Sequence, residues 1–145
     1  MNELLIKLLQ EEEGLTLDAI PDSKGYWEIG WGHDLPYVES GHKGLVWTKE
    51  QSDAQLILDA DEAWKFAMEL PRFDDCNNMQ QAALGSMCYQ LGSLAAWPKL
   101  RAALGGKDYA EAAKQCLMSN WVNQTPKRAY RESLMLATGL WIPKL

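Results

Sequence analysis

Residues 11–35, EEEGLTLDAIPDSKGYWEIGWGHDL, carry the pattern that decides the fold of this chain. An acidic helix end stops at a glycine, and an alternating, aromatic segment follows a turn rich in Pro, Asp and Gly, which is typical of a β-hairpin or small meander. The stretch holds the carboxylates of Glu13, Asp22 and Glu28. Glycosidic bond cleavage needs one carboxylic acid to protonate the leaving oxygen and a second carboxylate to activate water or attack the sugar. The pattern therefore indicates sugar-cleaving chemistry.

The sequence predicts helices on both sides of this stretch. Asn2 can cap a first helix with an apolar three-four repeat, which Gly14 ends. The Thr48-x-x-Gln51 pattern is a capping box that opens a helix running to about Leu70. Four further helices are expected near residues 79–91, 97–104, 108–118 and 126–138.

This order of elements predicts an α+β fold in a single domain spanning residues 1–145. We expect a small mixed lobe over about residues 12–60 and a helical lobe over about residues 70–145. The long helix would join them, the N-terminal helix would pack on the helical lobe, and a cleft would lie between the lobes.

Composition narrows the class of function. The formal net charge of −6, without a dense basic stretch, gives no electrostatic case for nucleic acid or an anionic membrane. Cys76, Cys88 and Cys116 have no metal-ligand or disulfide spacing, so no zinc site is expected and reduced thiols are the simplest interpretation. The N-terminal residues do not match a signal peptide, and no segment approaches a membrane span.

Two separate stretches resemble the phage-type lysozymes, the endolysins similar to T-even phage lysozyme. The first is EEGLTLDAIPDSKGYWEIGWGH, with a Glu-Gly pair, a later Asp and an IGxGH ending. The second is SNWVNQTPKRAYRESLMLATGLW, with a specific W-x-NQTP-x-RA-x-R block. Tyr89-Gln90-Leu91-Gly92 resembles a further landmark on the cleft floor. The resemblance spans almost the whole chain and keeps order and spacing.

The resemblance implies roles for two acids. Glu13 matches the general acid that protonates the leaving oxygen, and Asp22 matches the second carboxylate, which orients the attacking water. Arg128 would lie near Glu13 and favour its charged form, which opposes the effect of burial. Glu11 and Glu12 are expected to be solvated residues of the helix end.

The resemblance also implies residues that line or support the cleft. Tyr89, Gln90 and Trp121, with Arg128, fall where the family contacts sugar or positions the acid. Gly30 and His33 are expected to be structural. We hypothesise that His33 pairs with a carboxylate of the long helix, with Asp59 as the best candidate.

Glu28 departs from the family, which has a threonine at this position. In one interpretation Glu28 is a nucleophile that forms a glycosyl-enzyme intermediate, which gives retention and transglycosylation, with Asp22 as electrostatic helper. In a second it is a base for water beside Asp22, and the stereochemistry is inverting. In a third its side chain points away and the site is weakened.

The resemblance implies a muramidase that hydrolyses the β-1,4 bond between N-acetylmuramic acid and N-acetylglucosamine in peptidoglycan, without metal or cofactor. The alternative is a catalytically weakened lysozyme homologue that binds peptidoglycan. We expect a monomer that stays in the host cytoplasm until a holin-type partner releases it to the wall. The acidic charge predicts wall binding that depends only weakly on salt.

Overall fold

The computed structural model describes residues 1–22 and 24–144 and begins with helix α1, Glu3–Glu13. The side chain of Asn2 accepts a hydrogen bond from the Leu5 amide, and Gly14 at φ +69° ends the helix, as predicted. Leu5 is fully buried and packs on α3, where a Cβ on Gly85 would lie 3.0 Å from its side chain. A glycine on α3 therefore lets α1 approach closely.

Three antiparallel strands form a small sheet in the order β1 (Thr16–Pro21), β2 (Trp27–Gly30) and β3 (His33–Asp34). This confirms the predicted meander. Glu28 on the central strand pairs with Ile20 on one side and Asp34 on the other. Ile29, the next residue, is fully buried. Since neighbouring side chains on a strand face opposite ways, Glu28 is on the face away from Ile29.

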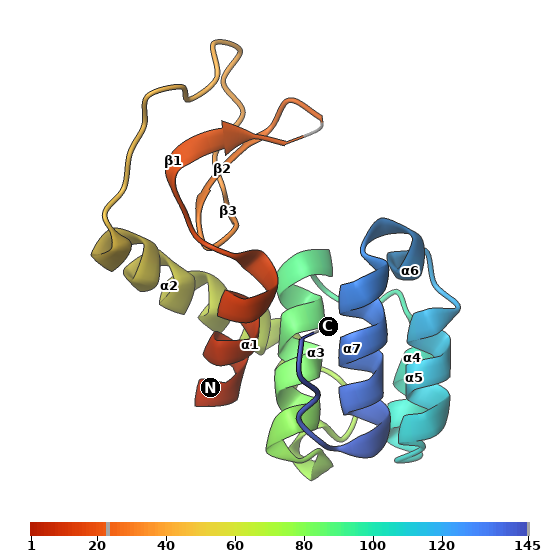
Figure 1. The fold of residues 1–145 in the computed structure, drawn as a ribbon. Helices are drawn as coiled ribbons and strands as arrows, with labels where there is room; N and C mark the ends of the chain where they lie inside the picture. Colours follow the sequence, from red (N-terminus) through yellow and green to blue (C-terminus); the bar gives the residue numbers. More distant parts are fainter. Residues whose placement is uncertain (23, 145) are drawn as a thin grey trace.

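Helix α2, Lys49–Met68, starts with the predicted capping box. The Thr48 hydroxyl accepts from the Gln51 amide at 3.1 Å, and the Gln51 side chain accepts from the Thr48 amide at 2.8 Å. In Figure 1 the sheet stands apart from the helices of the C-terminal half, and α2 runs between the two groups.

The rest of the chain is helical. It comprises a 3-10 turn η1 (Phe73–Asp75), α3 (Asn78–Leu91), α4 (Pro98–Gly105), α5 (Tyr109–Leu117), α6 (Trp121–Gln124) and α7 (Pro126–Thr138). The four longer helices agree with the sequence prediction within a few residues. The short elements η1 and α6 were not predicted, because single turns have no hydrophobic period to detect. Helix α7 packs against both α3 and α5 (Figure 1).

One apolar core joins α1 and α2 to the C-terminal helices. It includes the three buried cysteines, which are free thiols. Of the helices in the described residues, none combines the length and the apolar character that a membrane span requires. The architecture is α+β, as expected from the sequence.

Candidate active site

Glu13 lies at the C-terminal end of α1, where the helix gives way to the sheet. Its Oε1 accepts a hydrogen bond from Nη1 of Arg128 at 2.7 Å, and its side chain is 19% exposed. Gly32 covers it from the sheet side: a Cβ on this residue would overlap Glu13 Oε2, and its φ of +74° favours glycine. Glu13 is thus held between the helical core and the loop that joins β2 to β3.

Arg128, on α7, is almost completely buried behind Glu13. Its Nε donates to Glu132 Oε2 at 3.3 Å, and its Nη2 donates to the Ser86 hydroxyl at 2.9 Å. Burial opposes its charge, but Glu132 and Glu13 outweigh this effect and raise the pKa of Arg128. A permanent cation therefore stands at the rear of the Glu13 carboxylate, as the resemblance implied.

Glu28 is partly buried, and burial raises its pKa above the ordinary value. Three nearby carboxylates raise this pKa further, in the order Glu13, Asp34 and Asp22. Like charges disfavour simultaneous ionisation, so these neighbours favour the neutral form of Glu28. The side chain of Glu28 is consequently influenced by the charges of both Glu13 and Asp22.

Asp22 is exposed at the end of β1 and shapes the turn that follows. Its Oδ1 accepts from the amide of Lys24 at 2.8 Å and from the amide of Tyr26 at 3.0 Å. Its own amide donates to the Tyr26 carbonyl at 2.6 Å. One carboxylate oxygen of Asp22 is therefore engaged by the backbone. Of the three carboxylates that raise the pKa of Glu28 in addition to burial, Asp22 has the weakest influence.

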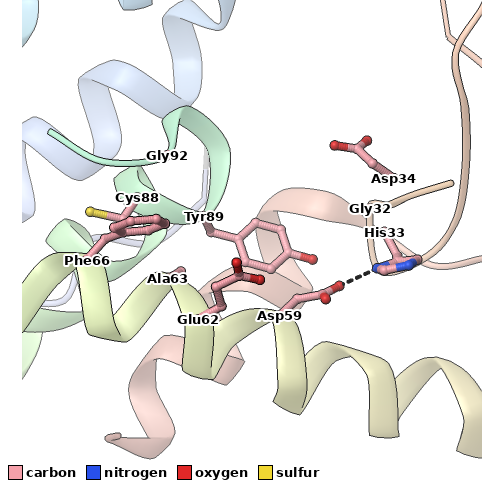
Figure 2. A pocket seen from close by; sticks show the side chains of 10 residues that line it. All are labelled: Gly32, His33, Asp34, Asp59, Glu62, Ala63, Phe66, Cys88, Tyr89 and Gly92. Carbon is pink, nitrogen blue, oxygen red and sulfur yellow. Dashed lines mark hydrogen bonds and ion pairs between the residues drawn. The ribbon is translucent and has the colours of Figure 1, made fainter. Parts of the chain in front are cut away.

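A pocket of about 250 Å³ opens between the sheet, α2 and α3. Gly32 and Asp34 line it from the sheet, Asp59 and Glu62 from α2, and Tyr89 from α3 (Figure 2). The pocket adjoins the Glu13 carboxylate through Gly32. Three of these residues are acidic, so the pocket suits uncharged or cationic groups better than anionic ones.

His33 supports the wall of this pocket. Its Nδ1 lies 2.7 Å from Asp59 Oδ2, which is the pair that we hypothesised from the sequence (Figure 2). The Gln55 amide donates to the other Asp59 oxygen at 2.9 Å, and the Trp47 ring centroid lies 5.6 Å from that of His33. The contact ties the sheet to α2. Gly30, at φ +68°, packs against α2 in the same region.

Among the residues that the resemblance places on the cleft floor, Tyr89 lines the pocket, whereas Trp121 and Arg128 are buried behind the surface. Tyr89 lines the pocket and donates its hydroxyl to the Trp31 carbonyl at 2.7 Å; burial first, then the charge of Glu13, raises its pKa. Gln90 accepts from the indole nitrogen of Trp121 at 2.9 Å. Trp121 and Arg128 are only 2% and 8% exposed, so they lie behind the surface, in contact with Gln90 and Glu13.

Glu11 and Glu12 differ from the expectation of solvated residues. Arg131 on α7 donates from Nη2 to Glu11 and from Nη1 to Glu12, each at 2.8 Å. Together with the Glu13–Arg128 pair, these bonds fasten the end of α1 to α7. Neither the local pattern nor the family resemblance pointed to these two pairs with Arg131.

Sequence reasoning also missed Glu132, Ser86 and the close cover of Gly32 over Glu13. One signal was available: Arg128 and Glu132 are four residues apart on a predicted helix and so share a face. In the residues for which the structure gives a placement, no group of three or more His, Cys, Asp or Glu side chains could hold a metal ion.

Fold and site together define an α+β protein in which Glu13, at the end of α1, lies near Glu28 on the small sheet. The family model for phage lysozyme matches residues 10–134. The chain therefore belongs to the phage lysozyme family, which supports a lysozyme function in general terms.

Two types of relative are similar to the chain. Probable T4-type lysozyme 1 of Dictyostelium discoideum is 26% identical, covering 91% of this chain and 92% of that protein. Probable T4-type lysozyme 2 of the same organism is 24% identical with the same coverage. The pre-baseplate central spike protein Gp5 of Enterobacteria phage T4 is 25% identical over 95% of this chain, which corresponds to only 28% of Gp5.

Proposed function

We propose that this protein is a muramidase that hydrolyses the β-1,4 bond between N-acetylmuramic acid and N-acetylglucosamine in bacterial peptidoglycan, and so lyses cells. The observation that carries the proposal is the Glu13–Arg128 contact of 2.7 Å, which holds a carboxyl group at the junction of sheet and helices. A glycan strand lying across this junction would present its glycosidic oxygen to Glu13. The lysozyme names of two relatives agree with this assignment.

In the proposed reaction Glu13 is the general acid. It transfers its proton to the leaving glycosidic oxygen, and the negative charge that remains on Glu13 is stabilised by Arg128. The Gly32 backbone packs against the other side of the carboxyl group, which keeps partial contact with solvent. Glu13 would therefore be held in one orientation throughout the proton transfer.

Glu28 is proposed as the nucleophile. Its carboxylate attacks the anomeric carbon as the bond to the leaving oxygen breaks, which forms a glycosyl-enzyme ester. Water, deprotonated by Glu13, then cleaves this ester and returns the proton to Glu13. The support is that Glu13 lies near enough to Glu28 to raise its pKa, after burial as the larger cause, and that a retaining mechanism places its two carboxyl groups close together.

The remaining residues support the two acids. We assign Asp22 to shaping the turn and to electrostatic help, since one of its oxygens already binds backbone amides. Tyr89 and Gln90 would contact the glycan, with Trp121 fixing the orientation of Gln90. We further propose that the protein acts as a monomer and reaches the wall through a holin-type partner.

A wall-lysis assay tests the class of function. Wild-type protein should reduce the turbidity of a suspension of purified bacterial walls, and Glu13→Gln should lose at least about a hundredfold in rate, the scale of general acid catalysis. Glu39→Gln, which removes an exposed loop carboxylate, is the matched control and should retain activity. Wild-type protein that binds walls without clearing them would instead favour a peptidoglycan-binding homologue.

The anomeric configuration of the fresh product tests the role of Glu28. Proton NMR should show the β-anomer first if Glu28 forms the ester, and Glu28→Thr should change the first product to the α-anomer. Product that is α from the start would refute the nucleophile and leave Glu28 as a base for water. Identical rate and anomer in wild type and Glu28→Thr would exclude both roles.

The acidic pocket supports the expectation that binding to the cell wall depends little on electrostatic attraction. With a net charge of −6 and with Asp34, Asp59 and Glu62 beside the site, attraction to anionic wall polymers contributes little. Lysis should therefore change little between low and physiological salt. A steep loss of lysis with added salt would contradict this reasoning.

A further inference from the structure

Glu132 is a fully buried carboxyl group that the proposed reaction does not yet use. It lies on α7, one turn after Arg128, and its Oε2 accepts from Arg128 Nε at 3.3 Å and from the Ser86 hydroxyl at 3.0 Å. Its Oε1 is enclosed and meets no hydrogen-bonding partner within the described part of the chain. Such a group is costly to bury, so its position behind the site needs a physical account.

The geometry places one cation between two acids. Arg128 donates from Nη1 to Glu13 and from Nε to Glu132, so the two carboxyl groups share a single guanidinium. Two carboxyl groups that share one cation are electrostatically coupled, so a change of charge on one affects the other. If Glu132 is neutral, the whole charge of Arg128 acts on Glu13 and favours its ionised form.

We propose that Glu132 is a positioning residue: it holds Arg128 from behind and offsets its charge, so that Glu13 keeps the proton that it must donate. This inference rests on the proposed function, in which Glu13 is the general acid. Glu132 itself does not touch the substrate, because it is entirely enclosed by the helices.

The surroundings of Glu132 agree with a group that titrates near neutrality. Burial, opposed by Arg128 and Ser86, raises the pKa of Glu132 to about 7. From α1, the charge of Glu12 raises this pKa as well, although Glu12 is itself paired with Arg131 at 2.8 Å.

On α5, Cys116 is the titratable group whose pKa depends on the charge of Glu132. Burial first, then the Glu132 charge, raises the pKa of the Cys116 thiol to about 12, so it stays neutral. Arg128 and Glu13 are therefore the groups through which a change of charge on Glu132 reaches the site.

The direct test is a carboxyl carbon NMR titration of wild-type protein from about pH 3 to about pH 9, which follows Glu13 and Glu132 separately. The Glu13 signal should titrate in two steps, and one step should coincide with the main titration of Glu132. A single step for Glu13 that ignores Glu132 would overturn the inference. This measurement needs no substitution, so it holds even if a variant fails to fold.

Glu132→Gln provides the second arm, because it keeps the side-chain size and removes the charge. The titration midpoint of Glu13 should move to lower pH by about half a pH unit or more, and the alkaline limb of the lysis profile should move with it. Ser133→Ala, which changes the neighbouring buried hydroxyl but no charge, is the matched control and should titrate as wild type. A folded Glu132→Gln protein with an unchanged Glu13 titration would refute the role.

The NMR readout does not depend on turnover. If wild-type protein fails to clear walls, the proposed function falls, while the coupling of Glu13 and Glu132 is still decided by the titration. If lysis is robust and the two groups titrate independently, the proposed function stands and the inference about Glu132 fails.

Discussion

Replacing Arg128 by Met is the most demanding test of how this site is built. The substitution keeps an unbranched apolar stem but removes the cation that lies between Glu13 and Glu132. Glu132 is 0% exposed and cannot turn toward water. The variant therefore leaves a buried carboxylate without its partner, which is the costly way to break a buried ion pair.

The magnitude follows from burial and contacts. Removing one partner of a buried pair costs about 3–5 kcal/mol, within a total stability of about 5–15 kcal/mol for a domain of this type. For a chain of this length each kcal/mol lowers Tm by roughly 2–4 °C, so we expect a loss of roughly 10 °C.

The loss should depend on pH in a defined direction. Burial already raises the pKa of Glu132 to about 7, and removing Arg128, which lowers it, raises it further. A carboxyl group with a raised folded pKa contributes its stability below the ordinary value of about 4.5 and loses it as pH rises through the folded pKa. Arg128→Met should therefore be much less destabilised at about pH 5 than at about pH 8.

Thermal unfolding followed by circular dichroism at both pH values measures this effect in a double-mutant cycle. Glu132→Gln should rescue Arg128→Met by about 2 kcal/mol at the higher pH, because it removes the unpaired charge. A loss of less than about 1 kcal/mol in Arg128→Met, an equal loss at both pH values, or no rescue would refute the reasoning.

Three further predictions concern the sheet side of the site. Glu28→Thr should raise the unfolding free energy at neutral pH by up to about 1 kcal/mol, after allowance for solvent screening, because it removes a carboxylate whose pKa is raised first by burial; an unchanged or lower Tm in thermal unfolding would contradict this. Gly32→Ala should cut the rate of wall lysis at least about tenfold and lower stability by roughly 1–3 kcal/mol, since a Cβ there overlaps the Glu13 carboxylate at a positive φ; wild-type lysis would show that the loop yields. In Asp59→Ala the Tm should fall by roughly 2–4 °C, because His33 and Gln55 lose the carboxylate that they contact at 2.7 Å and 2.9 Å; an unchanged Tm in thermal unfolding would mean that the contact does not stabilise the protein.

The prediction from sequence succeeded where the signal is local. Asn2, Thr48 and Gln51 cap their helices as predicted, because a cap depends on residues three positions apart. The longer helices follow from the three-four period of apolar residues. The single turns of η1 and α6 have no such period and were missed.

The candidate acids were likewise predicted from local patterns and from a family resemblance. The pairing of His33 with Asp59 was also anticipated, because the family-like register of the long helix made Asp59 the best candidate. The roles of Glu13, Asp22 and Glu28 stay proposals that activity measurements must decide.

The sequence by itself determined the longer helices and the three-stranded meander, because capping, periodicity and turn chemistry act over a few residues, and its family resemblance supplied the candidate acids. Apart from the neighbourhood of Glu13 and Arg128, which the family resemblance implied, only the tertiary structure decided what surrounds each acid. Helices α1 and α7 are more than a hundred residues apart in the sequence, and contacts between them place Arg128 between Glu13 and Glu132. The charge on a carboxyl group depends on burial and on neighbours in space, and neither can be read from its position in the chain.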